Sequence, residues 1–227
     1  MSKSQLTILN FSAKDNPNLY LDYLRVKYDV FVKELGWTKL PHSVADKIAY
    51  ADPYDAIADF IIAIYNNEVV GITRVIKIQH EFPYKEFFEP ILQLKIIRSF
   101  QNQLATLNSV AVKKEYRGVK ILNKNITVGE FILIKSVTYL QNKGVKIIFI
   151  TTDPNGSGGS FFKKLGFYTI SFPFSYPHSP TTLVNMVLVI NDKERFTKLN
   201  SPMLTNCKAM NQDERMIVQY LQQNSGN

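Results

Sequence analysis

The sequence predicts a mixed α/β fold in which one central sheet carries helices on both of its faces. Short apolar runs alternate along the chain with longer segments of helical periodicity, in the order strand, helix, hairpin, strand, helix, strand, helix, strand. Of the 227 residues, 45% are hydrophobic, which is enough for a packed core. We expect residues 1–190 to form this domain and residues 191–227 to form a C-terminal extension with a helix near 213–223.

The first half of the chain supplies a strand, a helix and a hairpin. The run "LTIL" (6–9) is expected to be the first strand. Apolar side chains then recur every three or four positions, which predicts a helix that Gly36 ends, with Leu21, Leu24, Tyr28, Phe31 and Leu35 on its buried face. Residues 58–78 predict two strands joined at Asn66-Asn67, because asparagine tolerates the left-handed backbone of a tight turn.

The second half continues the alternation of strands and helices. Residues 83–97 are expected to be helical at both ends with Pro90 interrupting them. The remaining segments predict a strand at 105–112, a helix at 125–144 that Gly144 ends, a buried strand at 145–152, a short helix within 155–167, and a closing strand at 181–190.

Positive charge is concentrated in the middle of the chain. The total is +8, and between positions 95 and 124 seven basic residues face only Glu115, a local balance of +6. The seven are Lys95, Arg98, Lys113, Lys114, Arg117, Lys120 and Lys124. Such a cluster is either a solvated surface or a site for an acidic partner.

Several classes of protein are not expected. The sequence contains no apolar run of about 18 residues, so we expect a cytoplasmic protein without membrane insertion. The single cysteine, Cys207, excludes an internal disulfide, and the three histidines do not cluster in the sequence, so no metal site is expected. No nucleic-acid-binding motif accompanies the positive charge.

The stretch "SVAVKKEYRGVKIL" (109–122) suggests an anion-binding turn. A strand that leads through a turn into a helix presents free backbone N–H groups, and Arg117-Gly118 adds a charge and room for close approach. With "FFKKLGF" (161–167), this stretch resembles the GCN5-related N-acyltransferase (GNAT) superfamily, which implies a splayed sheet. The resemblance implies that the donor contacts Val110, Ala111, Val112, Arg117, Gly118, Lys120 and Phe162.

Two differences from the GNAT pattern bear on the substrates. Lys120 and Leu122 occupy the positions of two small residues, so the turn is expected to hold free coenzyme A poorly. Phe162 replaces the tyrosine that often protonates the leaving thiolate, which leaves Tyr168 or water for that role.

The N-terminal half resembles two related families, the acyl-homoserine lactone synthases and the long-chain N-acyl amino acid synthases. The matching pieces are "RVKYDVFVKELGW" (25–37), "DPYDAIADFII" (52–62), "GITRV" (71–75) and "FPYKEFFEPIL" (82–92). The resemblance implies an acceptor or acyl pocket formed by Arg25, Phe31, Trp37, Asp52, Asp55 and Arg74. The chain differs from the lactone synthases at Thr106-Leu-Asn-Ser109, which replaces their Glu-x-Ser-Arg and argues against a homoserine lactone product.

These resemblances imply an N-acyltransferase without a permanently bound cofactor. The donor is expected to be a fatty acyl thioester of an acidic acyl carrier protein, or of coenzyme A, and the acceptor a primary amine such as an amino acid or a peptide side chain. Asn108 and Ser109 are expected to position a water that accepts the amine's proton. The alternatives are an acetyl-coenzyme A-dependent N-acetyltransferase and a non-catalytic binding protein. Asp52 and Asp55 could also be cap residues around Pro53, and Trp37 a core residue. Arg74 lies on an otherwise apolar strand, so its burial would require a carboxylate partner, and Asp52 and Asp55 are the candidates.

Overall fold

The computed structural model describes residues 6–37, 40–79, 82–120, 126–176 and 179–190. The chain forms two compact units that are interleaved along the sequence. Of the described residues, those within 6–76 and 107–139 belong to unit 1, and those within 77–106 and 140–190 belong to unit 2. Strand β6 (Leu104–Val112) passes from unit 2 into unit 1. The predicted mixed α/β fold is confirmed, whereas the extension at 191–227 and its helix lie outside the described residues.

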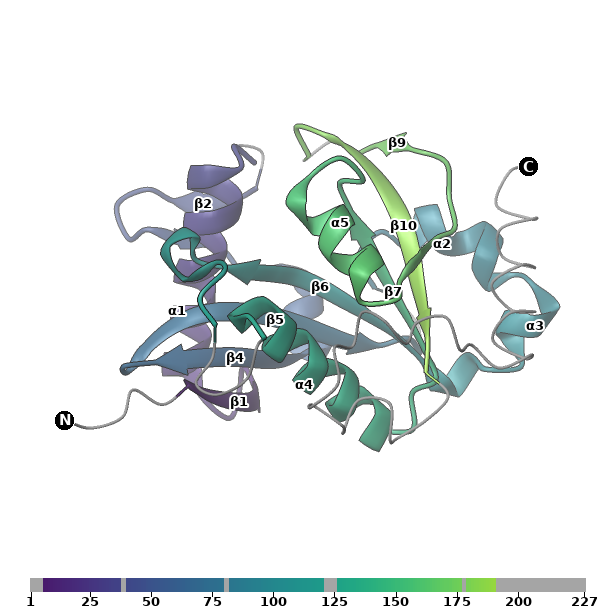
Figure 1. Cartoon of the computed structure of the whole chain (residues 1–227), viewed down its shortest axis with the longest axis horizontal. Coiled ribbons are helices and arrows are strands. Elements are labelled where there is room, and N and C mark those ends of the chain that lie inside the picture. Colours follow the sequence, from purple (N-terminus) through teal and green to yellow (C-terminus); the bar gives the residue numbers. More distant parts are fainter. Residues whose placement is uncertain (1–5, 38–39, 80–81, 121–125, 177–178, 191–227) are drawn as a thin grey trace. The chain divides into compact units, whose positions relative to one another are not determined.

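Unit 1 contains four neighbouring strands in the order β1-β4-β5-β6 (Figure 1). Its elements are β1 (Leu6–Ser12), α1 (Pro17–Lys27), η1 (Tyr28–Glu34), β2 (His42–Ser43), β3 (Ile48–Ala49), η2 (Pro53–Ile57), β4 (Asp59–Tyr65), β5 (Glu68–Lys77), η4 (Lys114–Tyr116) and α4 (Val128–Asn142), except that the last residue of β5 and the last three of α4 belong to unit 2. Strands β4 and β5 are antiparallel, and their turn places Asn66 and Asn67 at φ 50° and 64°. The predicted hairpin and its asparagine turn are therefore confirmed.

The predicted first helix is present, but its buried face is partly wrong. Asn16 caps α1 by accepting from Leu19 N at 3.1 Å, and at Tyr28 the α-helix becomes the π-helix η1, in which Leu35 N donates to Val30 O. A π-helix has more residues per turn than an α-helix, so side chains three or four positions apart no longer lie on one face. Leu35, which we expected to be buried, is exposed after this change, and Val30 and Val32 are buried instead. Leu21, also expected to be buried, is exposed within α1 itself, where Tyr23 and Val26 form the buried face.

Helices α1 and α4 cover opposite faces of the unit 1 sheet (Figure 1). Phe60 of β4 packs edge-on against Tyr23 of α1, with ring centroids 4.6 Å apart. Three positions later, Ala63 packs against Ile132 of α4. Successive side chains of a strand alternate between faces, so the two helices lie on different sides. Because Phe60 is paired with Arg74 in the β4–β5 register, Arg74 lies on the α1 side.

Unit 2 contains strands in the order β6-β7-β10-β8, with β9 paired to β10. Its further elements are α2 (Lys85–Leu92), α3 (Lys95–Arg98), η3 (Gln101–Gln103), β7 (Ile147–Thr152), α5 (Ser157–Lys164), β8 (Tyr168–Thr169), β9 (Phe174–Ser175) and β10 (Thr182–Val189). The β6–β7 pair is parallel and the β7–β10 pair is antiparallel. The predicted strands at 105–112, 145–152 and 181–190 are confirmed.

Pro90 lies inside α2 and does not interrupt it, contrary to our expectation. Proline removes one N–H, the one that would reach the carbonyl of Glu86. The loss is tolerated because α2 is short and is held by packing, since Phe88 and Ile91 are buried. The break between the two helical pieces comes after Leu92.

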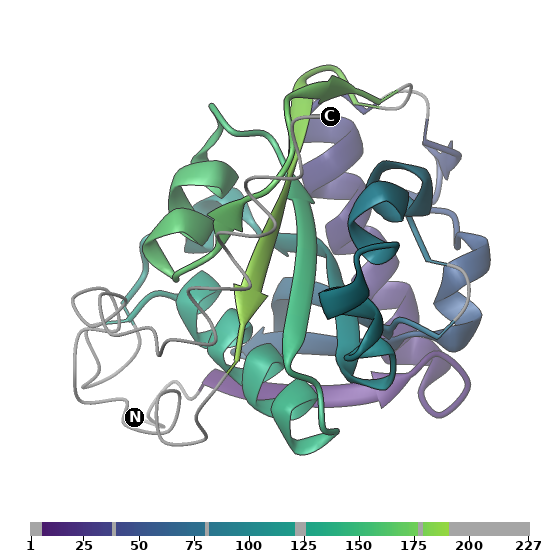
Figure 2. The same ribbon diagram turned by 90° about the vertical axis from the view of Figure 1, so that its right-hand side faces the viewer.

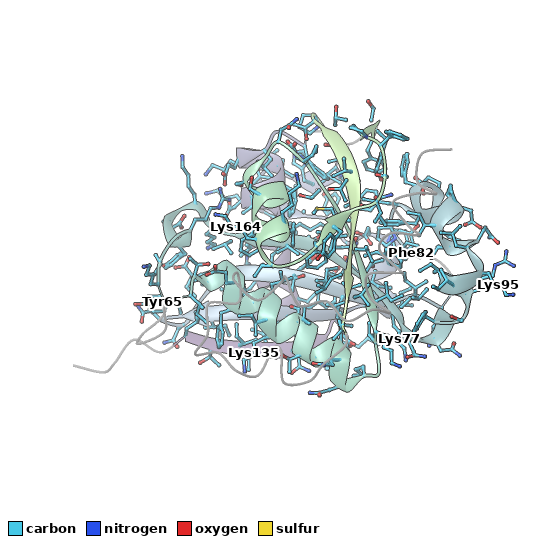
Figure 3. All side chains as sticks on the ribbon, turned by 45° about the vertical axis from the view of Figure 1, so that its right-hand side comes forward. Tyr65, Lys77, Phe82, Lys95, Lys135 and Lys164 are labelled. Atoms are coloured by element: carbon cyan, nitrogen blue, oxygen red, sulfur yellow. The ribbon has the colours of Figure 1, made fainter. Side chains whose placement is uncertain are left out.

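The core of unit 2 is aromatic where α2 meets β7. Phe88 of α2 lies 5.4 Å from Phe149 of β7 and 5.8 Å from Phe82, between ring centroids. Figure 2 shows α5 on the other side of β7 and β10 from α2 and α3. In Figure 3 Phe82 lies inside this unit, whereas Lys95 of α3 projects from its edge. Within the described residues, every helix is too short or too polar to cross a membrane.

Candidate functional site

A buried cluster of charges occupies the α1 side of unit 1. Arg74 of β5 places Nη1 2.5 Å from Asp52 Oδ2 and 2.5 Å from Asp55 Oδ1. The Arg74 and Asp55 side chains expose only 3% and 4%, and Asp52 exposes 33%. Our expectation that Arg74 needs a carboxylate partner is met by both aspartates. Asp52 also caps η2 by accepting from Tyr54 N, so these residues are helix caps and ion-pair partners at once.

Helix α1 adds three side chains that sequence analysis did not single out. The Tyr20 hydroxyl donates to Asp55 Oδ2 at 2.7 Å, and Lys27 Nζ lies 3.5 Å from Asp52 Oδ2. Tyr23 lies between them on the helix and is completely buried. The signal for this group was present in the sequence, because positions 20, 23 and 27 are spaced by three and four and so share one helix face.

Burial and neighbouring charges shift the pKa values of several side chains in this cluster. Burial acts to raise the pKa of Asp52, but the charges of Arg74 and Lys27 outweigh it, so the pKa lies below its ordinary value. Burial raises the pKa of Tyr20 and of Tyr23, which keeps both phenols protonated. Burial lowers the pKa of Lys27, and the negative charge of Asp52 opposes that change.

Two buried donor groups in this cluster lack hydrogen-bond partners among the described residues. They are Nε of Arg74 and the hydroxyl of Tyr23. An unsatisfied buried polar group costs about 1–3 kcal/mol, so native proteins rarely leave two together without a reason. The guanidinium of Arg74 also acts on the pKa of Tyr23, which indicates that the two groups are neighbours.

Strand β6 has an irregular backbone beside these donors. Ser109 has φ 52°, a left-handed conformation that is uncommon for a residue other than glycine. Its side chain lies near enough to the Tyr23 hydroxyl to affect the pKa of Tyr23, although the two do not meet the geometry of a hydrogen bond. The preceding carbonyl, of Asn108, accepts from Thr73 Oγ1 at 3.4 Å. The predicted catalytic pair therefore lies next to the charged cluster, with Asn108 buried and Ser109 half-buried.

The turn after β6 is held by carboxylates from distant parts of unit 1. Arg117 donates from Nε to Val112 O at 2.8 Å, and its Nη1 and Nη2 bind the Glu34 carboxylate at 2.5 and 2.8 Å. Lys113 Nζ lies 2.6 Å from Glu68 Oε1. Gly118 has φ 75°, as a tight turn requires. Two cations of the predicted basic cluster are thus paired with acidic side chains far away in sequence.

The other members of the basic cluster are distributed over both units. Lys114 and Lys120 are exposed in unit 1, Lys95 and Arg98 belong to α3 of unit 2, and Lys124 lies outside the described residues. The first turn of α4 is capped internally, because Thr127 N donates to Glu130 Oε2 at 2.6 Å.

The remaining predicted site residues are placed as follows. Arg25 is exposed and pairs with Asp22 at 2.7 Å, so it does not join the buried cluster. Phe31 and Trp37 contact each other with ring centroids 5.3 Å apart, both half-buried. Val110 and Val112 are half-buried and Ala111 is buried in β6. Phe162 is buried within unit 2, where its ring packs edge-on against that of Phe167.

Comparison with known proteins agrees with this architecture. Residues 26–125 match the family described as acetyltransferase (GNAT) domain. The acyl-homoserine lactone synthase LasI is 15% identical, with a TM-score of 0.64 over 92% of this chain and 100% of LasI. The chain has a GNAT fold.

Further structures share this GNAT fold. FeeM, an N-acyl amino acid synthase from uncultured soil microbes, is 14% identical with a TM-score of 0.60, covering 87% of this chain and 96% of FeeM. BjaI, a coenzyme A-dependent acyl-homoserine lactone synthase, is 13% identical with a TM-score of 0.61, covering 88% of this chain and 92% of BjaI. A search of curated protein sequences finds no match. The GNAT match spans Asp52, Asp55, Arg74, Ser109 and Arg117, so the ion-paired residues and the turn after β6 lie within it, whereas Tyr20 and Tyr23 precede it.

Proposed function

We propose that this protein is an N-acyltransferase that moves a medium or long acyl chain from a thioester to a primary amine. The observation that carries the proposal is the buried Asp52–Arg74–Asp55 cluster beside the irregular backbone of β6 at Ser109. The fold supports an acyltransferase, and the similar structures include synthases of acyl-homoserine lactones and of N-acyl amino acids.

The reaction proceeds by attack of a neutral amine on the thioester carbonyl. The C–N bond forms, the C–S bond breaks, and the thiolate leaves. The proton that the amine loses passes to a bound water, and the thiolate takes up a proton from that water. A backbone N–H of Val110–Val112 polarises the carbonyl oxygen and stabilises the negative charge that develops on it. Ser109 and Asn108 hold the water that receives the amine's proton, and positioning of the two substrates contributes most of the acceleration.

The two unsatisfied donors favour an amino acid as the acceptor. Nε of Arg74 and the hydroxyl of Tyr23 are closed to solvent in this structure, so they can donate to a carboxylate oxygen only after neighbouring side chains move aside. Arg–carboxylate pairing is among the stronger charge-assisted contacts. Asp52, the more exposed aspartate, can attract the ammonium group before it loses its proton. An amine without a carboxylate would leave both donors unsatisfied.

The donor is a thioester of acyl carrier protein or of coenzyme A, and the carrier protein is the first choice. Lys114 and Lys120 are exposed next to Arg117 and offer charge to an acidic carrier. Charge reversal at both should slow the reaction of carrier-bound donors more than that of free coenzyme A thioesters. An equal loss with both kinds of donor would contradict a docking surface.

One assay tests the proposal. The protein is incubated with carrier-bound and coenzyme A thioesters of several chain lengths and a pool of amino acids and amines, while thiol release and amide products are followed. Long-chain donors and carboxylate-bearing amines should react fastest. Faster turnover of acetyl-coenzyme A than of every long-chain donor would favour an N-acetyltransferase. Binding of thioesters without turnover would favour a non-catalytic protein.

The acceptor subsite has its own test. Tyr23→Phe removes one unsatisfied donor and should raise the KM for the amino acid while leaving the KM for the donor unchanged. Tyr28→Phe is the matched control, because Tyr28 is buried in a separate cluster with Val32 and Ala49. Equal effects of the two substitutions on the amino acid KM would contradict the subsite.

A further inference from the structure

We propose that Glu34 is a specificity-determining residue of the donor turn, where its carboxylate occupies the guanidinium that a donor phosphate would bind. The inference rests on the proposed function, because it takes the donor to bind at the turn after β6. Phosphate-bearing donors must then compete with a residue of the protein itself.

Every nitrogen of the Arg117 guanidinium is already engaged. Nε donates to Val112 O, which anchors the side chain to the end of β6, and both Nη groups bind Glu34 in a two-pronged contact. Arginine binds phosphate with this same fork of parallel N–H groups. The Glu34 carboxylate therefore stands where two phosphate oxygens would lie.

The contact is accessible and can be displaced. The Arg117 side chain exposes 38% and the Glu34 side chain 29%. Ion pairs exposed to this extent stabilise a fold only weakly, because water screens them. A phosphate can therefore replace the carboxylate at small cost, while the negative charge of Glu34 continues to repel it. Donors with several phosphates, such as coenzyme A, are disfavoured most, and a carrier-bound arm with a single phosphate least.

The position of Glu34 links the donor turn to the predicted acceptor side. Glu34 is the last residue of η1, and three residues later Trp37 N donates to Phe31 O at 2.9 Å. The Phe31 and Trp37 rings are in contact. Displacement of Glu34 by a phosphate should therefore alter the surroundings of Trp37, the single tryptophan of the chain.

Titration with free coenzyme A tests the inference without any need for turnover. Affinity is measured by calorimetry and by tryptophan fluorescence for the wild type, Glu34→Gln and Glu68→Gln. Glu68→Gln is the matched control, because it also removes one negative charge, which in the wild type is paired with Lys113 on the same turn. We expect Glu34→Gln to tighten binding about fivefold, as loss of a weak competing pair implies. Glu68→Gln should change it by less than about twofold, the effect of a nearby charge alone.

A double variant separates competition from general electrostatics. Arg117→Ala placed on Glu34→Gln should abolish the gain, because the freed guanidinium is what binds the phosphate. Unchanged or weaker coenzyme A binding by Glu34→Gln would overturn the inference, as would an equal gain with Glu68→Gln. The proposed function fails separately, if the wild type binds coenzyme A but no thioester is turned over.

Discussion

Arg74 and Asp55 form an ion pair that is almost completely buried, with Nη1 2.5 Å from Oδ1. The two residues are 19 positions apart, one on β5 and the other in the short helix η2. The pair joins η2 to the sheet, and the Tyr20 hydroxyl extends the connection to α1. The Asp55 carboxylate therefore connects three elements of unit 1, namely η2, β5 and α1.

Asp55→Asn should lower the free energy of unfolding by about 3–5 kcal/mol, because it leaves the buried charge of Arg74 without its buried partner. Asp22→Asn breaks the exposed Arg25–Asp22 pair and should cost less than about 1 kcal/mol. Denaturant unfolding of the two variants and the wild type measures both differences. Similar losses in the two variants would contradict a structural role for the buried pair.

Asp52→Asn should reduce the loss of stability that acid pH causes. The pKa of Asp52 in the folded protein lies below its ordinary value of 3.8, so the folded state favours the ionised carboxylate. This contribution is complete above the ordinary pKa and is lost as the pH falls through the lower, folded-state pKa. The wild type should therefore lose more stability than Asp52→Asn between about pH 5 and pH 2. Parallel curves for the two proteins would refute this role.

Ser109→Gly should raise stability and lower activity. Glycine adopts a positive φ without the steric strain of serine. We therefore expect the substitution to raise the free energy of unfolding by about 0.5–1 kcal/mol. The same change removes the hydroxyl beside Tyr23, so acyl transfer should slow. Asn67→Gly is the control, since Asn67 also has a positive φ but lies in the β4–β5 turn, and asparagine tolerates it. A loss of stability in Ser109→Gly would show that the backbone at 109 is not strained.

Gly71→Ala should destabilise unit 1 through overpacking. A Cβ at position 71 would lie 2.3 Å from Ile132 Cδ1 of α4, so the isoleucine has to move. The expected cost is about 1–3 kcal/mol. Ile132→Val removes the clashing methyl, and the double variant should be more stable than the sum of the single losses predicts. Additive losses would show that the strand and the helix do not meet at this point.

Local patterns in the sequence predicted most of the elements correctly. The Asn66-Asn67 turn, the helix stops at Gly36 and Gly144, and the apolar strands at 105–112 and 145–152 depend on propensities within a few residues of each position. The same reasoning misplaced the buried face after Tyr28, because a change to π-helical geometry leaves no mark on a three-and-four spacing. Pro90 was likewise misjudged because tertiary packing outweighed a local preference.

The sequence by itself determined the alternation of strands and helices, the basic turn after β6, and the expectation that Arg74 needs a carboxylate. Only the tertiary structure decided which carboxylates meet which cations. Glu34 and Arg117 are 83 positions apart, and Glu68 and Lys113 are 45 apart. Such pairs arise when strand register and helix packing bring distant segments together, and no local periodicity encodes them. For that reason a turn that looks positively charged in the sequence is partly neutralised in the fold.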